Sequence, residues 1–217
     1  MLHGYQGKAI DAYVTACGRP TSRPFIDVRL DTDKAELIEA LEAIGDASVD
    51  VRLGYNPSFV NRFDASDYVS RYSILAALVR EKMPNARLIF GDTMEGMDLI
   101  GLMDRWPDRD SIDGFYIGYY DDSNVAAKVK LRESLALAAE QGVPVSFDSV
   151  VFKYGASVAK VRAFGEVIDA SPTPIESITV HDVDFRRDRH VNHWGDCRVT
   201  TDRDVLAAWA VLTGGDV

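Results

Sequence analysis

The chain has 217 residues, of which 47% are hydrophobic and 27% charged, so it can bury a full core and lies near the lower length limit of a complete (β/α)8 barrel. Its 34 acidic and 24 basic residues give a formal net charge of -10, with no run of five or six charges of one sign. This pattern argues against nucleic acid as a partner and against a disordered charged tail, and it repels acidic glycans and phosphates at long range.

The first residues, Met1 to Gly7, show no basic start followed by an apolar run, and no window approaches 18 consecutive apolar residues. We therefore expect a soluble chain without an export signal and without a membrane partner. Cys17 and Cys197 lie far apart in sequence, and buried free thiols are the expectation for both. Neither cysteine identifies the cellular compartment, so the localisation stays open.

Short apolar runs alternate with amphipathic segments along the chain, which is typical of repeated βα units around a parallel sheet. Phe25 to Leu30 alternates apolar and polar residues, which indicates a half-exposed or edge strand. The predicted strands are Leu2 to Tyr5, Phe25 to Leu30, Val49 to Leu53, Arg87 to Phe90, Gly114 to Tyr119, Val143 to Phe147 and Ser177 to Val183.

Helices are predicted between these strands. Asp33, with Glu36 three residues later, resembles a capping box, and Gly45 ends the same segment. Ser66 opens a second helix that Pro84 ends. The other predicted helices are Ile10 to Cys17, Met97 to Met103, Val125 to Ala139, Val158 to Ile168 and Val205 to Leu212. With no linker in sight, we predict one domain over residues 1–217, a shortened or incomplete (β/α)8-like TIM barrel of about seven βα units.

Acidic residues follow four successive predicted strands, where a parallel barrel carries its chemistry. They are Asp92, Asp121, Asp122, Asp148, Asp182 and Asp184. Carboxylates gathered at one mouth, with aromatic side chains as flat surfaces against a sugar ring, would suit a glycosidase. The candidate aromatic residues are Tyr55, Trp106, Tyr119 and Tyr120.

Simpler roles compete with this interpretation. An Asp in a strand-to-helix loop more often caps the next helix, and a tyrosine more often fills the barrel. His181 has no His or Cys partner at metal-ligand spacing, so we predict no metal site and no cofactor. A Gly-x-Ser-x-Gly elbow is absent, which disfavours a serine hydrolase.

Several motifs resemble glycoside hydrolase family 26, the mannanase-like (β/α)8 enzymes and their bacterial relatives. Val51 to Tyr55, then Phe63 to Val69, then Pro84 to Phe90, are similar to the family's fourth and fifth barrel strands. Further similar segments are Trp106 to Phe115 for the sixth strand, Gly142 to Ser149 for the seventh and His181 to Phe185 for the eighth. Trp194 to Val199 resembles the C-terminal Trp-Gly-Asp-Ser-Arg motif, the most specific match. The resemblance covers residues 49 to 212.

The departures from the family pattern bear on activity. The family uses two glutamates, an acid/base in a Gly-Tyr-Glu context after the fourth strand and a nucleophile at the end of the seventh. Here the first position is Asn56, and the second is Asp148, or Ser149 if the gap falls differently. An Asn has no titratable proton, and Asp is a methylene shorter than Glu, whereas retaining hydrolysis needs the carboxyl groups about 5 to 5.5 Å apart. The resemblance therefore implies that the inherited mechanism is lost.

Three interpretations remain open. The first is a catalytically degenerate barrel, a pseudoenzyme that binds a glycan or serves as a structural component of a protein assembly or homo-oligomer, such as part of a virus particle. Its candidate binding residues are Tyr55, Asn56, Trp106, Tyr119, Asp182 and Asp184, with Asp121 and Asp148 nearby.

The second interpretation is a surviving glycosidase that acts on a β-linked polysaccharide through a rebuilt pair, with Asp148 as nucleophile and Asp92 or Asp121 as acid. In an inverting arrangement a water molecule would occupy a gap of about 6.5 to 9.5 Å between the two carboxyl groups. The third is an unrelated small-molecule or scaffold role, because a common fold does not fix function.

Overall fold

The structure is a computed structural model of the 217-residue chain. It describes all residues except 22, 24, 29–31, 46–48, 54–64, 94–102, 122–124, 189–193 and 215–217. The side chains of residues 65–68, 92, 93, 148 and 187 also lie outside the description.

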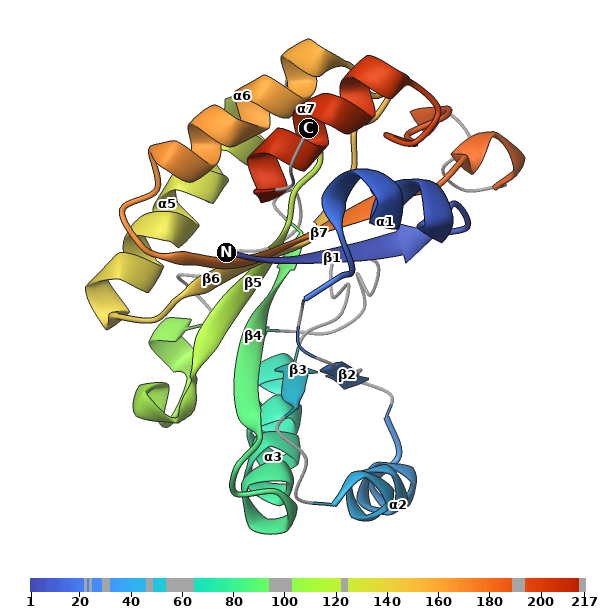
Figure 1. The fold of residues 1–217 in the computed structure, drawn as a ribbon. Coiled ribbons are helices and arrows are strands. Elements are labelled where there is room, and N and C mark those ends of the chain that lie inside the picture. Colours follow the sequence, from blue (N-terminus) through green and yellow to red (C-terminus); the bar gives the residue numbers. More distant parts are fainter. Residues whose placement is uncertain are drawn as a thin grey trace. The chain divides into compact units, whose positions relative to one another are not determined.

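Seven strands alternate with helices along the chain (Figure 1). They are β1 (Leu2–Gly7), β2 (Phe25–Val28), β3 (Asp50–Leu53), β4 (Arg87–Thr93), β5 (Gly114–Gly118), β6 (Val145–Val150) and β7 (Ile175–Asp182). The strand order is β1-β7-β6-β5-β4-β3-β2, and the pairs β1–β7, β2–β3 and β3–β4 are parallel. From β2 to β7 each strand pairs with the next strand in sequence, and β1 pairs with the last strand, as in a (β/α) barrel. The difference from a closed barrel is that β1 and β2 are the two edge strands. All seven predicted strands are confirmed, and so is the fold class, a shortened (β/α) TIM-barrel-like fold.

The helices follow the predicted segments closely. They are α1 (Ile10–Cys17), α2 (Lys34–Ile44), α3 (Ala65–Lys82), α5 (Val125–Gln141), α6 (Val158–Asp169) and α7 (Arg203–Thr213). Asp33 caps α2 as predicted, because its side chain accepts hydrogen bonds from the backbone N–H groups of Ala35 and Glu36. Most of the predicted helix from Met97 to Met103 lies outside the described residues, and residues 103–105 are helical.

The chain divides into two compact units. Unit 1 comprises Met1–Ser22, Gly118–Val125 and Ser146–Val217, and unit 2 comprises Arg23–Ile117 and Ala126–Val145. The expectation of a single domain over residues 1–217 stays a prediction.

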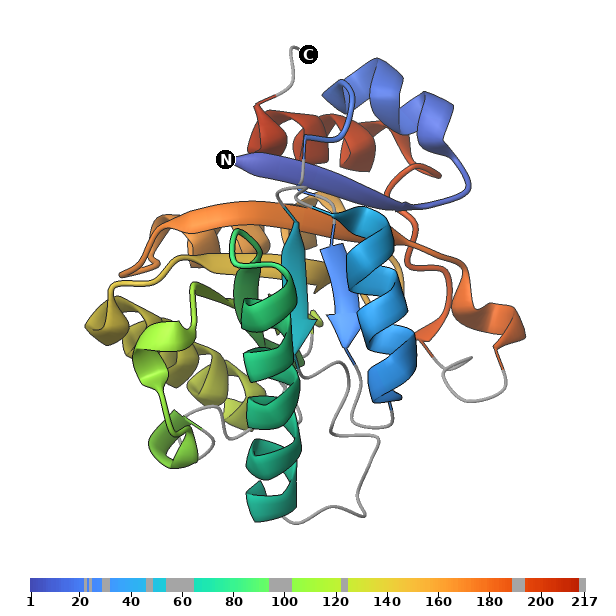
Figure 2. The same ribbon diagram turned by 90° about the horizontal axis from the view of Figure 1, so that it is seen from below.

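In unit 1, α1 and α7 lie side by side over one face of the β1–β7 pair (Figure 2). The register places Tyr5 opposite Val180 and Gly7 opposite Asp182. Aromatic rings fill the space beneath the helices, with Phe164 of α6 stacked on Trp209 of α7 at a centroid distance of 6.1 Å. Cys17 and Cys197 are both free and buried, as predicted.

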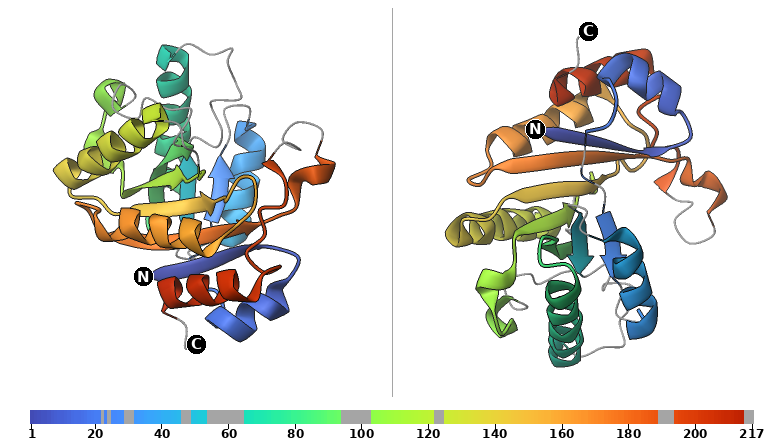
Figure 3. Two further views of the ribbon diagram at one scale, coloured as in Figure 1. Left: turned by 90° about the horizontal axis from the view of Figure 1, so that it is seen from above. Right: turned by 60° about the horizontal axis from the view of Figure 1, so that its bottom comes forward.

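In unit 2, helices α2 and α3 lie beside the β2–β3–β4 strands (Figure 3). Arg80 of α3 ties the amino-terminal ends of two strands together, because its guanidinium donates to the carbonyls of Ala86 and Ser111 and to the Asp113 carboxylate at 2.7 Å. Asp113 also accepts from the backbone N–H of Leu88. This end of the strands therefore stabilises the fold, as is usual in barrels.

Candidate binding site at the strand ends

The carboxyl ends of β5 and β6 continue to pair beyond the regular strands in unit 1. The N–H of Val151 donates to the carbonyl of Tyr119, and the N–H of Asp121 donates to the carbonyl of Val151, each at 2.9 Å. A parallel bridge joins Tyr120 to Val151. This pairing brings the residues that follow β5 next to those that follow β6.

Tyr119 and Tyr120 make their contacts on opposite sides of this extended segment, as expected of consecutive residues. The ring of Tyr119 packs against Phe147 and against Phe164 of α6, at centroid distances of 6.1 and 4.6 Å, and is 7% exposed. Burial raises the pKa of Tyr119 to about 12. Tyr119, a candidate aromatic surface for a sugar ring, is thus part of the core. The ring of Tyr120 instead packs against Trp194, with ring centroids 5.2 Å apart.

Lys153, three residues beyond β6, places its ammonium between two aromatic rings. Its Nζ lies 4.6 Å from the ring centroid of Trp194 and 5.0 Å from that of Tyr120, and the residue is only 5% exposed. Aromatic faces attract a cation most strongly where water is excluded. No sequence pattern points to this lysine, because only the fold brings it to the two rings.

Asp121, a candidate catalytic acid, is held in an ion pair. Its carboxylate lies 2.8 Å from Nζ of Lys160, which also donates to the carbonyl of Lys153. Asp121 therefore helps to fix the backbone around Lys153.

Asp182, a candidate binding residue at the end of β7, is 2% exposed and surrounded by donors. Its carboxylate accepts from the N–H groups of Val199 and Thr200, from the Thr200 hydroxyl and from the Tyr5 hydroxyl, at 2.6 to 3.1 Å. The pKa of Tyr5 is raised to about 12 by burial and by this bond to Asp182. These contacts fasten β7 to β1 and to the segment before α7, which is a structural role.

His181 lies on the opposite face of β7 from Asp182, because side chains alternate along a strand. Its Nδ1 is 3.2 Å from Oγ of Ser149 on β6, and its ring meets the ring of Phe185 edge-on at 5.6 Å. Burial lowers the pKa of His181 below its ordinary value of 6.5, and the charge of Asp182 opposes this shift. Burial therefore favours the neutral form of the His181 imidazole.

Phe185 continues the ring contacts to Trp194, with centroids 5.2 Å apart. His181, Phe185, Trp194, Tyr120, Lys153 and Ser149 thus form one group of side chains from three strand ends, which we call the strand-end cluster. Ser149, His181, Phe185 and Trp194 are each half-buried, so each keeps part of its surface exposed.

Asp184, another candidate binding residue, belongs to a network of hydrogen bonds and ion pairs that orders the chain around Trp194. Asp184 and Asp196 form an antiparallel bridge, and their carboxylates are bonded by Arg186 and Arg198 respectively. The bond from Arg186 keeps the pKa of Asp184 well below its usual range, and the bond from Arg198, at 2.6 Å, lowers that of Asp196. The Trp-Gly-Asp-x-Arg motif therefore orders the chain around its own tryptophan.

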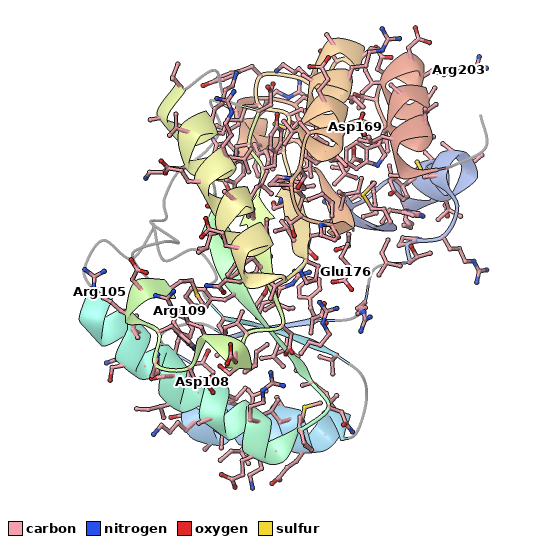
Figure 4. The ribbon with its side chains drawn as sticks, turned by 90° about the vertical axis from the view of Figure 1, so that its left-hand side faces the viewer. Arg105, Asp108, Arg109, Asp169, Glu176 and Arg203 are labelled. Carbon is pink, nitrogen blue, oxygen red and sulfur yellow. The ribbon has the colours of Figure 1, made fainter. Side chains whose placement is uncertain are left out.

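Trp106, a candidate sugar platform in unit 2, is buried at 5% exposure. It packs against Phe90 at 5.0 Å, and its Nε1 lies 3.4 Å from the Ser111 hydroxyl. Charged residues of the same segment, among them Arg105, Asp108 and Arg109, lie at the surface (Figure 4). The structure thus gives Trp106 a packing role.

The remaining candidates are only partly described. Asp92 lies in β4 and Asp148 in β6, but the side chains of both are outside the description. Tyr55, Asn56 and Asp122 lie outside the described residues altogether. The carboxyl separation on which the glycosidase hypothesis depends is therefore untested.

Within the described residues, no group of three or more His, Cys, Asp or Glu side chains is arranged to hold a metal ion. In the same part of the chain, no helix has the length and apolar character that crossing a bilayer requires.

Known proteins resemble this chain in fold rather than in sequence. No family model and no curated protein matches the sequence. Among solved structures, an endo-1,4-beta-xylanase from Caldicellulosiruptor owensensis is similar at a TM-score of 0.57 and 11% identity, over 82% of this chain and 66% of the xylanase chain. A GH26 beta-mannanase from Bacteroides ovatus is similar at 0.48 and 10% identity, over 98% of this chain and 87% of its own.

GH26C from a Muricauda species is similar at a TM-score of 0.49 and 12% identity, over 69% of this chain, which spans 54% of the GH26C chain. The chain thus covers about half the length of that protein and just under two thirds of the xylanase. The likeness to the xylanase shows a glycoside-hydrolase-like barrel fold, which confirms the predicted resemblance at the level of the fold.

Proposed function

We propose that this chain is a catalytically degenerate glycoside-hydrolase-like barrel that binds a glycan at the strand-end cluster. The observation that supports this most is the continuous series of rings from Tyr120 through Trp194 and Phe185 to His181, at strand ends where barrels bind their ligands.

The chemistry of the cluster suits a neutral sugar. Flat aromatic faces pack against the apolar C–H faces of a pyranose ring, and a few polar groups fix its orientation. Trp194 and Phe185 supply half-buried aromatic surface, while Ser149 and His181 supply hydroxyl and imidazole partners for sugar hydroxyls. The net charge of -10 favours a neutral polysaccharide over an acidic one.

We infer the loss of glycosidic cleavage from the state of the candidate catalytic carboxylates. Hydrolysis of a glycosidic bond uses a pair of carboxyl groups, and the acid/base position carries Asn56. Asp121, Asp182 and Asp184 are each engaged in ion pairs or saturated hydrogen bonds. A rebuilt pair would therefore depend on Asp148 and Asp92.

The test combines binding and turnover on one panel of β-mannan, β-glucan and xylan. Affinity electrophoresis in gels containing each polysaccharide measures binding, and release of reducing ends measures turnover. We expect retardation by at least one polysaccharide without any release. Trp194→Ala should abolish the retardation, whereas Val211→Ala, which shortens an exposed side chain on α7, should leave it unchanged.

Two results would overturn the proposal. Release of reducing ends that Asp148→Asn abolishes would establish the active glycosidase instead. An absence of binding to every polysaccharide would favour the structural role, as part of a protein assembly or homo-oligomer. The mass of the purified protein in solution would then show whether the chain forms an oligomer.

A further inference from the structure

Ser149 and His181 form the pairing that nucleophilic catalysis requires. They are 32 residues apart in sequence and are brought together at the ends of β6 and β7, with Oγ 3.2 Å from Nδ1. A hydroxyl becomes a nucleophile when an adjacent base at hydrogen-bond distance accepts its proton.

The surroundings of His181 favour this base function. Burial disfavours its imidazolium form, and in the neutral ring an unprotonated Nδ1 can accept the serine proton. The edge contact with Phe185 restrains the ring. The neighbouring Asp182 carboxylate attracts the positive charge that forms when the proton arrives, although its own hydrogen bonds lie on the other face of β7.

We propose that Ser149 and His181 form a nucleophile–base pair that accepts the acyl group of small esters. Both residues are half-buried and adjoin the aromatic surface of Phe185 and Trp194, which would hold an apolar or sugar-linked alcohol. This activity is distinct from glycosidic cleavage and does not use Asp148 or Asp92.

The reaction balances with water as the only co-reactant. Oγ of Ser149 attacks the ester carbonyl and forms the new C–O bond, while its proton passes to Nδ1 of His181. The C–O bond to the alcohol breaks, and the leaving alkoxide takes the proton from His181. Water, deprotonated by His181, then attacks the acyl-serine, the acyl C–Oγ bond breaks, and Oγ of Ser149 takes the proton back from His181, so that one ester and one water give one acid and one alcohol.

Turnover should be slow, because within the described part of the chain no carboxylate bonds Nε2 of His181. Removing that third group from a catalytic triad costs about four orders of magnitude in rate. Covalent capture of the nucleophile is therefore a more sensitive readout than steady-state hydrolysis.

The experiment labels the folded chain with a fluorophosphonate, which forms an Oγ–P bond and releases fluoride. Intact mass gives the extent of labelling, and peptide mapping gives the residue. We expect a single label on Ser149, none in Ser149→Ala, and labelling at least about 100-fold slower in His181→Gln. Ser73→Ala, a control at a half-buried serine of α3, should label like the parent chain.

Hydrolysis of p-nitrophenyl acetate should fall in the same order. Peptide mapping of the parent chain needs no variant, so the test stands even if a substitution impairs folding. A label on another residue, or labelling of the folded chain no faster than that of the heat-denatured chain, would overturn the proposal. Labelling of Ser149 in a chain that binds no polysaccharide would show that this activity is separate from the proposed function.

Discussion

The two faces of β7 differ in the hydrogen bonds that their side chains make with the rest of unit 1. On the face covered by α1 and α7, Asp182 is 2% exposed and accepts four hydrogen bonds from Tyr5, Val199 and Thr200. On the other face, its neighbour His181 is half-buried and its ring nitrogens make one hydrogen bond within the described residues, with Ser149. Asp182, whose oxygens accept four hydrogen bonds, stabilises the fold. His181 makes fewer hydrogen bonds and can still bind a ligand.

The same contrast distinguishes acidic residues that look alike in sequence. Asp182, Asp184 and Asp121 all follow strand ends, as catalytic carboxylates do in barrels. In the structure each is bonded by backbone or cationic donors, so its position serves the chain itself. The half-buried side chains of the strand-end cluster are two aromatic rings, a serine and a histidine.

The largest expected effect comes from removing Asp182. In Asp182→Ala the buried donors of Val199 and Thr200 lose their acceptor, and a buried unsatisfied donor costs about 1 to 3 kcal/mol. We expect the free energy of unfolding to fall by about 3 to 5 kcal/mol in urea denaturation.

The matched control for this prediction is Asp182→Asn. Its remaining oxygen can serve the two backbone N–H groups, and its amide can donate to the hydroxyls of Tyr5 and Thr200. We expect it to lose less than half as much stability as the alanine variant. Equal losses would show that the charge of Asp182, rather than its acceptors, stabilises the fold.

Gly7 offers a second way to disturb the helix-covered face. A Cβ at this position would lie 2.5 Å from the Tyr5 hydroxyl oxygen and 2.7 Å from the carbonyl oxygen of Asp182. Since the carbonyl belongs to the β7 backbone, Gly7→Ala should destabilise the chain by about 1 to 3 kcal/mol, measured as a lower thermal midpoint. A midpoint equal to that of the parent chain would show that β1 and β7 are packed less closely.

His181 lies on the other face of β7, and we expect His181→Gln to affect stability less. The ring makes one side-chain hydrogen bond in the described structure, so we expect a change in unfolding free energy below about 1 kcal/mol. A loss as large as that of Asp182→Ala would remove the distinction between the two faces.

The smallest expected effect is a dependence on pH. Burial lowers the pKa of both His181 and His3, so the folded chain binds fewer protons than the unfolded chain below pH 6.5. Their contribution to stability is complete above pH 6.5 and is lost as the pH falls towards the lowered values. The drop in thermal midpoint from pH 7 to 5 should therefore be smaller in His181→Gln than in the parent chain. An unchanged drop would show that His181 is accessible to protons in the folded state.

The seven strands could be predicted from the sequence because each is a short apolar or alternating run between helical segments. Asp33 capping α2 shows how local these signals are. The strand-end cluster could not be predicted in the same way. Lys153 carries no motif. Ser149 and His181 lie in segments that resemble the family's seventh and eighth strands, but no sequence pattern predicts their contacts with each other and with Phe185. Trp106 and Tyr119 were candidates by position, but side-chain alternation and packing place both in the core.

The Trp-Gly-Asp-x-Arg motif is visible in the sequence, but its physical role is not. The structure shows that Asp196 and Arg198 are bonded to each other and that the bridge to Asp184 orders the chain around Trp194. Arg198 bonds Asp196, two residues before it, whereas the antiparallel contact that brings Asp184 within 3.8 Å of Arg198 is encoded by no local pattern.

Binding without cleavage is the property that matters most to test. The most direct measurement adds the purified chain to β-mannan, β-glucan and xylan in parallel and records heat of binding and released reducing ends in the same samples. We predict saturable binding to at least one polysaccharide, lost in Trp194→Ala, with no reducing ends above the buffer control. Reducing ends that accumulate with the parent chain but not with Asp148→Asn would contradict the loss of catalysis.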